Sequence, residues 1–317
     1  MLSLTQESAT PNPSPPEAST GADGLRRTPF LVRFWRAAWR RKSGLVACLF
    51  LLAIIVVALL APHIAPRDPN AQFLLHRLRP PMWAEGGSAQ YILGTDHLGR
   101  DVLSRILHGA RISLAVGITA VLVSAGIGVP LGLWAGYAGG RVDNVLMRIA
   151  DIQMAFPAVL LAIAIIAVVG PSLTNLILVL GVTGWVVFAR VARAQALVLR
   201  EVEYVQAARA MGASDVAILF RHVLPNAVSS IIVVGTTQVA QVIISEAALS
   251  FLGLGVPISV PTWGGMLNEA KLYLSLAGWL ASLPGLAIML SVISINLVGD
   301  LLRDVLDPRL KYDHIPQ

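Results

Sequence analysis

Long apolar runs without a charged residue divide the sequence into segments that can cross a bilayer. Residues 44–61 form an uncharged run of 18 residues, 112–140 one of 29 and 155–189 one of 35. A transmembrane helix needs about 20 apolar residues, so the third run is too long for one span. Gly170-Pro171-Ser172 interrupts it and predicts a turn between two helices.

Two further apolar segments complete a set of six predicted spans. These spans are 44–62, 112–138, 153–170, 174–194, 227–252 and 278–302. The predicted fold class is therefore all-α, a polytopic membrane protein with a transmembrane domain over residues 44–302. Composition agrees, since only 13% of the residues are charged, against about 25% in soluble domains.

The segments outside the spans are polar or rich in proline. Residues 1–28 predict a disordered cytosolic tail, and 29–43 a basic segment at the membrane interface. The extracytoplasmic loop 63–111 is irregular at first and then predicts a short surface helix over 101–111. The first apolar run begins only at residue 44, so we expect a retained span and no cleaved signal peptide.

Lysine and arginine are distributed unevenly between the segments, and this predicts the orientation. Of the 24 basic residues, 17 lie in the N-terminal tail, the alternate loops and the C-terminal tail 303–317, which are therefore assigned to the cytosol. Arg100 and Arg105 run against the bias, although Asp96 and Asp101 lie among them. Because membrane orientation explains the net charge of +6, we expect no nucleic-acid partner.

Glycines recur every four residues in the second span. They follow Ser124 and are Gly128, Gly132, Gly136 and Gly140. On a helix, such residues share one face, where a neighbouring backbone can approach closely. The spacing predicts a helix-packing seam.

The sequence contains no internal source of energy for transport. A phosphate-binding P-loop needs a glycine before its lysine, but only Lys42 precedes a Ser or Thr, and Arg41 occupies the glycine position. The spans hold one carboxylate at membrane depth, Glu246. An intramembrane enzyme is thus disfavoured, and we expect no catalytic residue, cofactor or metal ligand in the chain. A stand-alone secondary transporter remains an alternative that rests on Glu246 alone.

The cytosolic loop 199–226 has the pattern of two short helices. Gly212 is positioned to end the first, Ser214 or Asp215 can cap the second, and Leu224-Pro225 should stop it. Small residues at Ala207, Ala208 and Gly212 offer a surface for another protein, although a solvated hairpin without a partner fits the residues equally well.

The same loop resembles the Glu-Ala-Ala loop of binding-protein-dependent ABC importer permeases. Gln206-Ala-Ala, Gly212, His222 and Leu224-Pro225 follow the family spacing EAA-x3-G-x9-I-x-LP, with Gln206 in place of glutamate and His222, expected to be a surface residue, in place of isoleucine. The residues that the resemblance assigns to ATPase coupling are Gln206, Ala207, Ala208, Arg209, Gly212, Ala213, Asp215, Leu224 and Pro225.

A second motif resembles the dipeptide, oligopeptide and nickel permeases, in particular their "C-type" subunit. The signature before the second span comprises Gly94, Thr95, Asp96, Gly99, Arg100, Asp101, Ser104 and Arg105. Residues 246–255 and 307–310 also match this subunit.

The resemblance implies the transmembrane-domain fold of a type I ABC importer in the bacterial cytoplasmic (inner) membrane. The implied partners are a homologous second permease subunit, two cytosolic ATPase subunits or one fused ATPase, and an extracytoplasmic substrate-binding protein. ATP and Mg would be bound by the ATPase subunits. Dipeptides or oligopeptides are the expected substrates, with nickel chelates or glutathione as alternatives.

Two interpretations remain open for several polar residues on the predicted outer side. Asp96 and Arg100 either pair with each other, which is favoured, or meet another subunit. Glu246 either acts at a gate or hydrogen-bonds the backbone. Asn268 and Glu269 are candidates for the pore entrance.

Overall fold

The computed structural model describes residues 34–35, 38–39 and 42–306, and these contain helices and no β-strand. The helices are α2 (Lys42–Ile64), α3 (Val102–Ala138), α4 (Gly140–Met154), α5 (Ala158–Val169), α6 (Leu173–Leu199), α7 (Glu203–Ala210), α8 (Asp215–Ile218), α9 (Leu224–Phe251), α10 (Trp263–Ala270) and α11 (Trp279–Leu306), with short 3-10 turns at Leu74–His76 and Lys271–Tyr273. The predicted disordered tail 1–28, most of the basic segment 29–43 and the motif at 307–310 lie outside the described residues.

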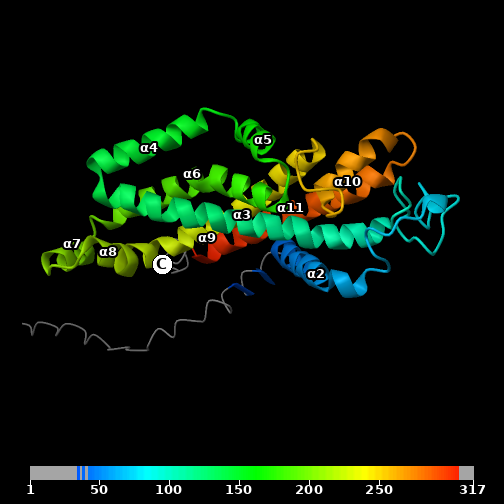
Figure 1. Cartoon of the computed structure of the whole chain (residues 1–317). Coiled ribbons are helices and arrows are strands. Elements are labelled where there is room, and N and C mark those ends of the chain that lie inside the picture. Colours follow the sequence, from blue (N-terminus) through cyan, green and yellow to red (C-terminus); the bar gives the residue numbers. More distant parts are fainter. Residues whose placement is uncertain (1–33, 36–37, 40–41, 307–317) are drawn as a thin grey trace, which may run out of the picture.

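The molecule is an elongated bundle in which the long helices run side by side (Figure 1). Helices α3, α6, α9 and α11 form its body, and α2 packs against α3 and α11. Helices α7 and α8 lie at one end, and α10 with the loop before α3 lies at the other (Figure 1). The predicted all-α membrane fold is confirmed, since α2, α3, α6, α11 and the helix over Asp215–Phe251 are each long and apolar enough to cross a bilayer.

The segment over α4 and α5 differs from the prediction of one spanning helix over 153–170. Helices α4 and α5 make an angle of 86° there. Pro157 precedes α5 and causes the break, because proline has no N–H to continue the helix and disfavours helical geometry in the residue before it. With 12 residues, α5 is about 18 Å long, shorter than the bilayer core.

Helix α3 is longer than predicted. The expected surface helix over 101–111 and the second span form one helix of 37 residues, Val102–Ala138. Asp101 begins it, since its carboxylate accepts hydrogen bonds from the backbone N–H and the hydroxyl of Ser104 at 2.8 and 2.7 Å. The short polar stretch before the uncharged run is thus the first part of the same rod.

The glycine seam packs α3 against α6. A Cβ on Gly128 would lie 2.2 Å from the carbonyl oxygen of Trp185, and one on Gly132 would lie 2.1 Å from that of Ala189. Gly136 makes the same kind of approach one turn further on. Only a hydrogen atom fits at these positions, so the two backbones pack directly against each other.

Gly140 does not belong to this seam. It has a φ of +55°, and a Cβ there would meet nothing within 4 Å. Together with Gly139 it turns the chain from α3 into α4. The four-residue spacing predicted the seam, but α3 ends before its last member.

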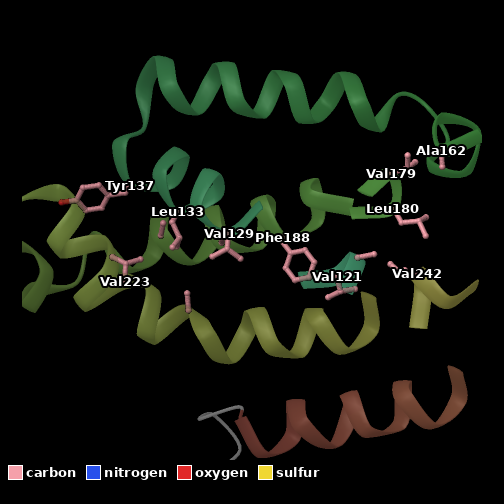
Figure 2. Close-up of a cluster of buried hydrophobic side chains, with 14 of the residues drawn as sticks. Val121, Val129, Leu133, Tyr137, Ala162, Val179, Leu180, Phe188, Val223 and Val242 are labelled. Atoms are coloured by element: carbon pink, nitrogen blue, oxygen red, sulfur yellow. The ribbon is translucent and has the colours of Figure 1, made fainter. Parts of the chain in front are cut away.

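The main apolar cluster connects the membrane helices to the hairpin 199–226. Val129 and Leu133 of α3, Phe188 of α6 and Val223, just before α9, all lie in it (Figure 2). Val205 and Ala208 of α7 and Ile218 of α8 are buried in the same cluster. The hairpin is therefore anchored to the bundle by its own core residues.

Candidate functional site

The turn between α7 and α8 is built by Gly212. Its φ is +80°, which an L side chain rarely adopts. The N–H of Gly212 donates to the Arg209 carbonyl at 3.0 Å, and that of Ala213 donates to the Ala208 carbonyl at 3.1 Å. This pair of bonds is a Schellman motif, so the predicted glycine end of the first helix is confirmed.

Ser214, rather than Asp215, caps the second helix. The Ser214 hydroxyl oxygen accepts a hydrogen bond from the N–H of Ala217 at 3.3 Å. Asp215 is instead the first helical residue, and its carboxylate accepts a hydrogen bond from the Tyr137 hydroxyl at 3.0 Å. Because Tyr137 lies at the C-terminal end of α3, this bond ties the hairpin to the bundle.

The predicted stop at Leu224-Pro225 is wrong. Helix α8 continues through a π-helical turn, Leu219–Val223, directly into α9. Proline tolerates the first turn of a helix, and the wider π turn before it accommodates the missing N–H and the bulk of the ring. The second arm of the hairpin and the membrane helix are therefore one rod, Asp215–Phe251.

The exposed surface of the hairpin carries apolar residues among charged ones such as Glu203, Arg209 and Arg221. Ala207 and Gly212 are on it as predicted, but Ala208 is 5% exposed and packs inside. The most exposed large apolar side chains are Met211, Val216 and Phe220, at 83, 64 and 62%. The sequence interpretation overlooked these three, although apolar residues at solvent-facing positions of a short hairpin are the signal that could have found them.

A polar hollow of about 660 Å³ opens where the hairpin meets the end of α3. Its lining residues are Tyr137, Ala138, Arg200, Glu201, Gln206, Arg209 and Asp215. The guanidinium of Arg209 lies 4.9 Å from the centre of the Tyr137 ring, and Gln206 donates a hydrogen bond to the carbonyl of Glu201 at 3.2 Å. The hollow is large enough to take a side chain of another protein.

On the opposite end of the bundle, four charged groups form a buried cluster. Asp96 accepts hydrogen bonds from Arg100 and Arg105, each at 2.6 Å, and Glu269 accepts two from Arg105, at 2.6 and 3.0 Å, and one from Arg100. Both arginines are 2% exposed. Burial raises the pKa of Asp96, but the charges of Arg105 and Arg100 outweigh it and hold that pKa below its usual value.

The other signature residues shape the loop around this cluster. The Thr95 hydroxyl donates to the carbonyl of His76 and accepts a bond from the N–H of Arg79. Gly99 has a φ of +74°, and a Cβ there would lie 1.9 Å from the carbonyl oxygen of Phe73. Gly94 is likewise left-handed. The motif is thus the internal framework of the loop, and the favoured pairing of Asp96 with Arg100 is present.

Glu269 therefore points into the cluster, with its side chain only 12% exposed, and its place at a pore entrance stays a prediction. Asn268 is half-buried beside the turn at Gly253. Ligand atoms of Asp96, His97 and Glu269 lie within 4.8 Å of one another. A metal ion would have to displace the arginines from both carboxylates, so these residues do not fit a metal site.

Glu246 of α9 is fully buried where α3, α9 and α10 meet. Its carboxyl group accepts hydrogen bonds from the hydroxyls of Ser250, at 2.8 Å, and Ser113, at 3.2 Å. These partners are side-chain hydroxyls rather than the predicted backbone groups. A role at a gate remains a prediction.

Sequence comparison identifies the family. Residues 128–312 match the binding-protein-dependent transport system inner membrane component, and residues 29–81 match the N-terminal TM domain of oligopeptide transport permease C. The chain belongs to this permease family. It is a multi-pass permease subunit of an ABC importer, and the family is one of transport components rather than enzymes.

Permeases similar to this chain are named for two kinds of substrate. It is 46% identical over 281 residues to the di/tripeptide transport system permease protein DppC of Pseudomonas aeruginosa, covering 89% of this chain and 93% of that protein. It is 47% identical over 285 residues to the glutathione transport system permease protein GsiD of Pectobacterium atrosepticum, covering 90% and 93%. GsiD of Escherichia coli O157:H7 is equally similar, with 90% and 92% covered.

The fold of the permease resembles that of a solved transporter. An inward-facing structure of the MetNI methionine ABC transporter superposes with a TM-score of 0.52 at 21% identity, over 63% of this chain and 96% of that chain. At this identity the likeness concerns the fold alone. It agrees with the importer transmembrane-domain architecture that the sequence predicts.

Proposed function

We propose that this permease forms half of the pore of an ATP-driven importer of short peptides, and that the hairpin 199–226 docks a separate ATPase. The observation that carries the proposal is the high exposure of three apolar side chains, Met211, Val216 and Phe220, on a hairpin that is otherwise firmly anchored. Such residues cost free energy in water and stabilise a complex when a partner covers them.

The continuous helix gives the docked ATPase a mechanical connection to the membrane. Motion of the hairpin at Gly212 moves Asp215, which begins the rod that ends at Phe251. A rigid helix transmits such a displacement over its whole length, and packed interfaces convert it into discrete rearrangements. ATPase closure would in this way switch the pore between inward and outward access.

The orientation follows from the same assignment. The permease lies in the inner membrane of a bacterium. Its hairpin, both termini and the positively charged loops face the cytosol. The implied assembly contains a second permease subunit, two ATPases or one fused ATPase that bind ATP and Mg, and a binding protein. That binding protein would meet the opposite end of the bundle, around loop 63–101 and α10.

The proposed substrates are short peptides. DppC is named for di/tripeptides and GsiD for glutathione, itself a tripeptide, so the named substrates share peptide groups. A nickel chelate stays the alternative within the wider family that the sequence resembles.

Reconstitution tests this function. Proteoliposomes that hold the permease with its second permease, ATPase and binding protein should take up a labelled dipeptide only when ATP is supplied to the ATPase. Omitting the ATPase or the binding protein should abolish uptake. Uptake driven by an ion gradient without the ATPase would instead indicate a secondary transporter and overturn the proposal.

A further inference from the structure

One face of α9 is polar at membrane depth. Gln241 is exposed and Gln238 is half-buried, and both lie near the midpoint of α9. Neither amide has a hydrogen-bond partner among the described residues. The face continues along the helix through Ser230, Thr237 and Ser245, which recur at helical spacing.

Two hollows lie along this face. One, of about 460 Å³, lies between α9 and the last turns of α11 and is lined by Ser230, Thr237 and Arg303. The other, of about 320 Å³, lies between α5, α6 and α9, where Gln238, Gln241 and Ser245 line it. Its apolar wall includes Ala162, Leu180 and Val242, which Figure 2 shows on the three helices. A volume of about 300 Å³ is at the lower limit of small-ligand sites.

Facing lipid is unfavourable for these amides. A primary amide without a hydrogen-bond partner costs several kcal/mol in hydrocarbon. Polar side chains within a membrane accordingly face water-filled cavities or other protein groups. The hollow between α5, α6 and α9 is such a place.

The other polar groups around this hollow are already occupied. The Thr183 hydroxyl donates to the carbonyl of Val179 at 2.8 Å. Gln153 donates to the Thr183 carbonyl and accepts a bond from the indole of Trp185, both at 2.7 Å. The free donors and acceptors that face the hollow are thus the amides of Gln238 and Gln241 and the hydroxyl of Ser245.

We propose that Gln238, Gln241 and Ser245 form a substrate-binding site for peptide groups within the translocation pathway. This inference rests on the proposed function. A side-chain amide presents one carbonyl and one NH₂, which complement the N–H and C=O of a peptide bond. The lining holds no charged residue, so the site would recognise the peptide backbone and not the charged termini or side chains.

Substituting the amides distinguishes an effect on substrate binding from an effect on ATPase coupling. In the reconstituted importer, the double variant Gln238→Leu/Gln241→Leu should lower dipeptide uptake about tenfold or more, because two hydrogen bonds to the passing substrate are lost. The uptake advantage of a dipeptide over its depsipeptide analogue, in which an ester replaces the amide, should shrink in the same variant. Binding-protein-stimulated ATP hydrolysis should persist.

Two controls make the result decisive. Gln195→Leu removes a glutamine of α6 that lines neither hollow and should leave uptake unchanged, and Gln238→Asn/Gln241→Asn should restore part of the uptake. Unchanged uptake in the leucine variant would overturn the site. Loss of the second permease subunit when this variant is purified would also overturn it, since the amides would then be subunit contacts. Failure of the unmodified importer to move dipeptides would instead refute the proposed function.

Discussion

Gly212→Val abolishes ATP-driven uptake while the permease still inserts and assembles with its partners. The left-handed φ of +80° at this position is strained for any side chain and most of all for a β-branched one. A Cβ would meet nothing within 4 Å, so the cost comes from the backbone and not from a clash. Relief of the strain re-aims α7 against α8 and misplaces Met211 and Phe220 relative to the ATPase.

The matched variant is Gly212→Asn. Asparagine adopts the left-handed region several times more readily than other non-glycine residues, so most of the uptake should return. Uptake and ATP hydrolysis in proteoliposomes measure both variants. Full uptake with valine would show that the shape of the turn does not govern coupling.

Arg105→Met destabilises the end of the bundle that holds the buried charge cluster. Removing one partner of a buried ion pair costs about 3–5 kcal/mol, because the remaining charges stay buried without compensation. Here Asp96 and Glu269 would share Arg100 alone. Thermal unfolding of the purified permease should begin several degrees lower, and limited proteolysis should cut the loop before α3 sooner.

Arg190→Met is the control for this variant. Its partner is Asp151, and the two side chains are 46 and 56% exposed, so the pair contributes about 0–1 kcal/mol. Equal melting temperatures for the two variants would show that the buried cluster does not stabilise the loop before α3. Acid should act like Arg105→Met. The lowered pKa of Asp96 contributes stability above its unfolded-state value of about 3.9. This stability is lost as the pH falls through that value and then through the lower pKa of the folded state.

Local patterns predicted much of the architecture. Uncharged runs located the membrane helices, the spacing of Gly128, Gly132 and Gly136 located the seam, and Gly212 located the turn. Each depends on chemistry within a few residues of the chain. The wrong predictions arose where a neighbouring element extends or ends a helix, as with Pro225, which the π turn absorbs, and α5, which Pro157 shortens.

Contacts between distant segments could not be predicted. Glu269 joins Arg100 across 169 residues, and no spacing in the sequence relates them. Burial of Ala208 depends on how α7 packs against the bundle. The free amides of α9 became recognisable as a site only when α5, α6 and α9 enclosed a hollow beside them.

Site-specific cross-linking tests the docking of the ATPase most directly. Cys48 is the only cysteine, so Cys48→Ser gives a background in which Met211→Cys places one thiol on the hairpin. Val168→Cys, at the far end of α5, is a control of equal exposure, 85% against 83%. In the assembled importer, a short thiol-to-amine cross-linker should join residue 211 to the ATPase and residue 168 to none of it. Absence of the adduct from residue 211 in an importer that still transports would contradict the account.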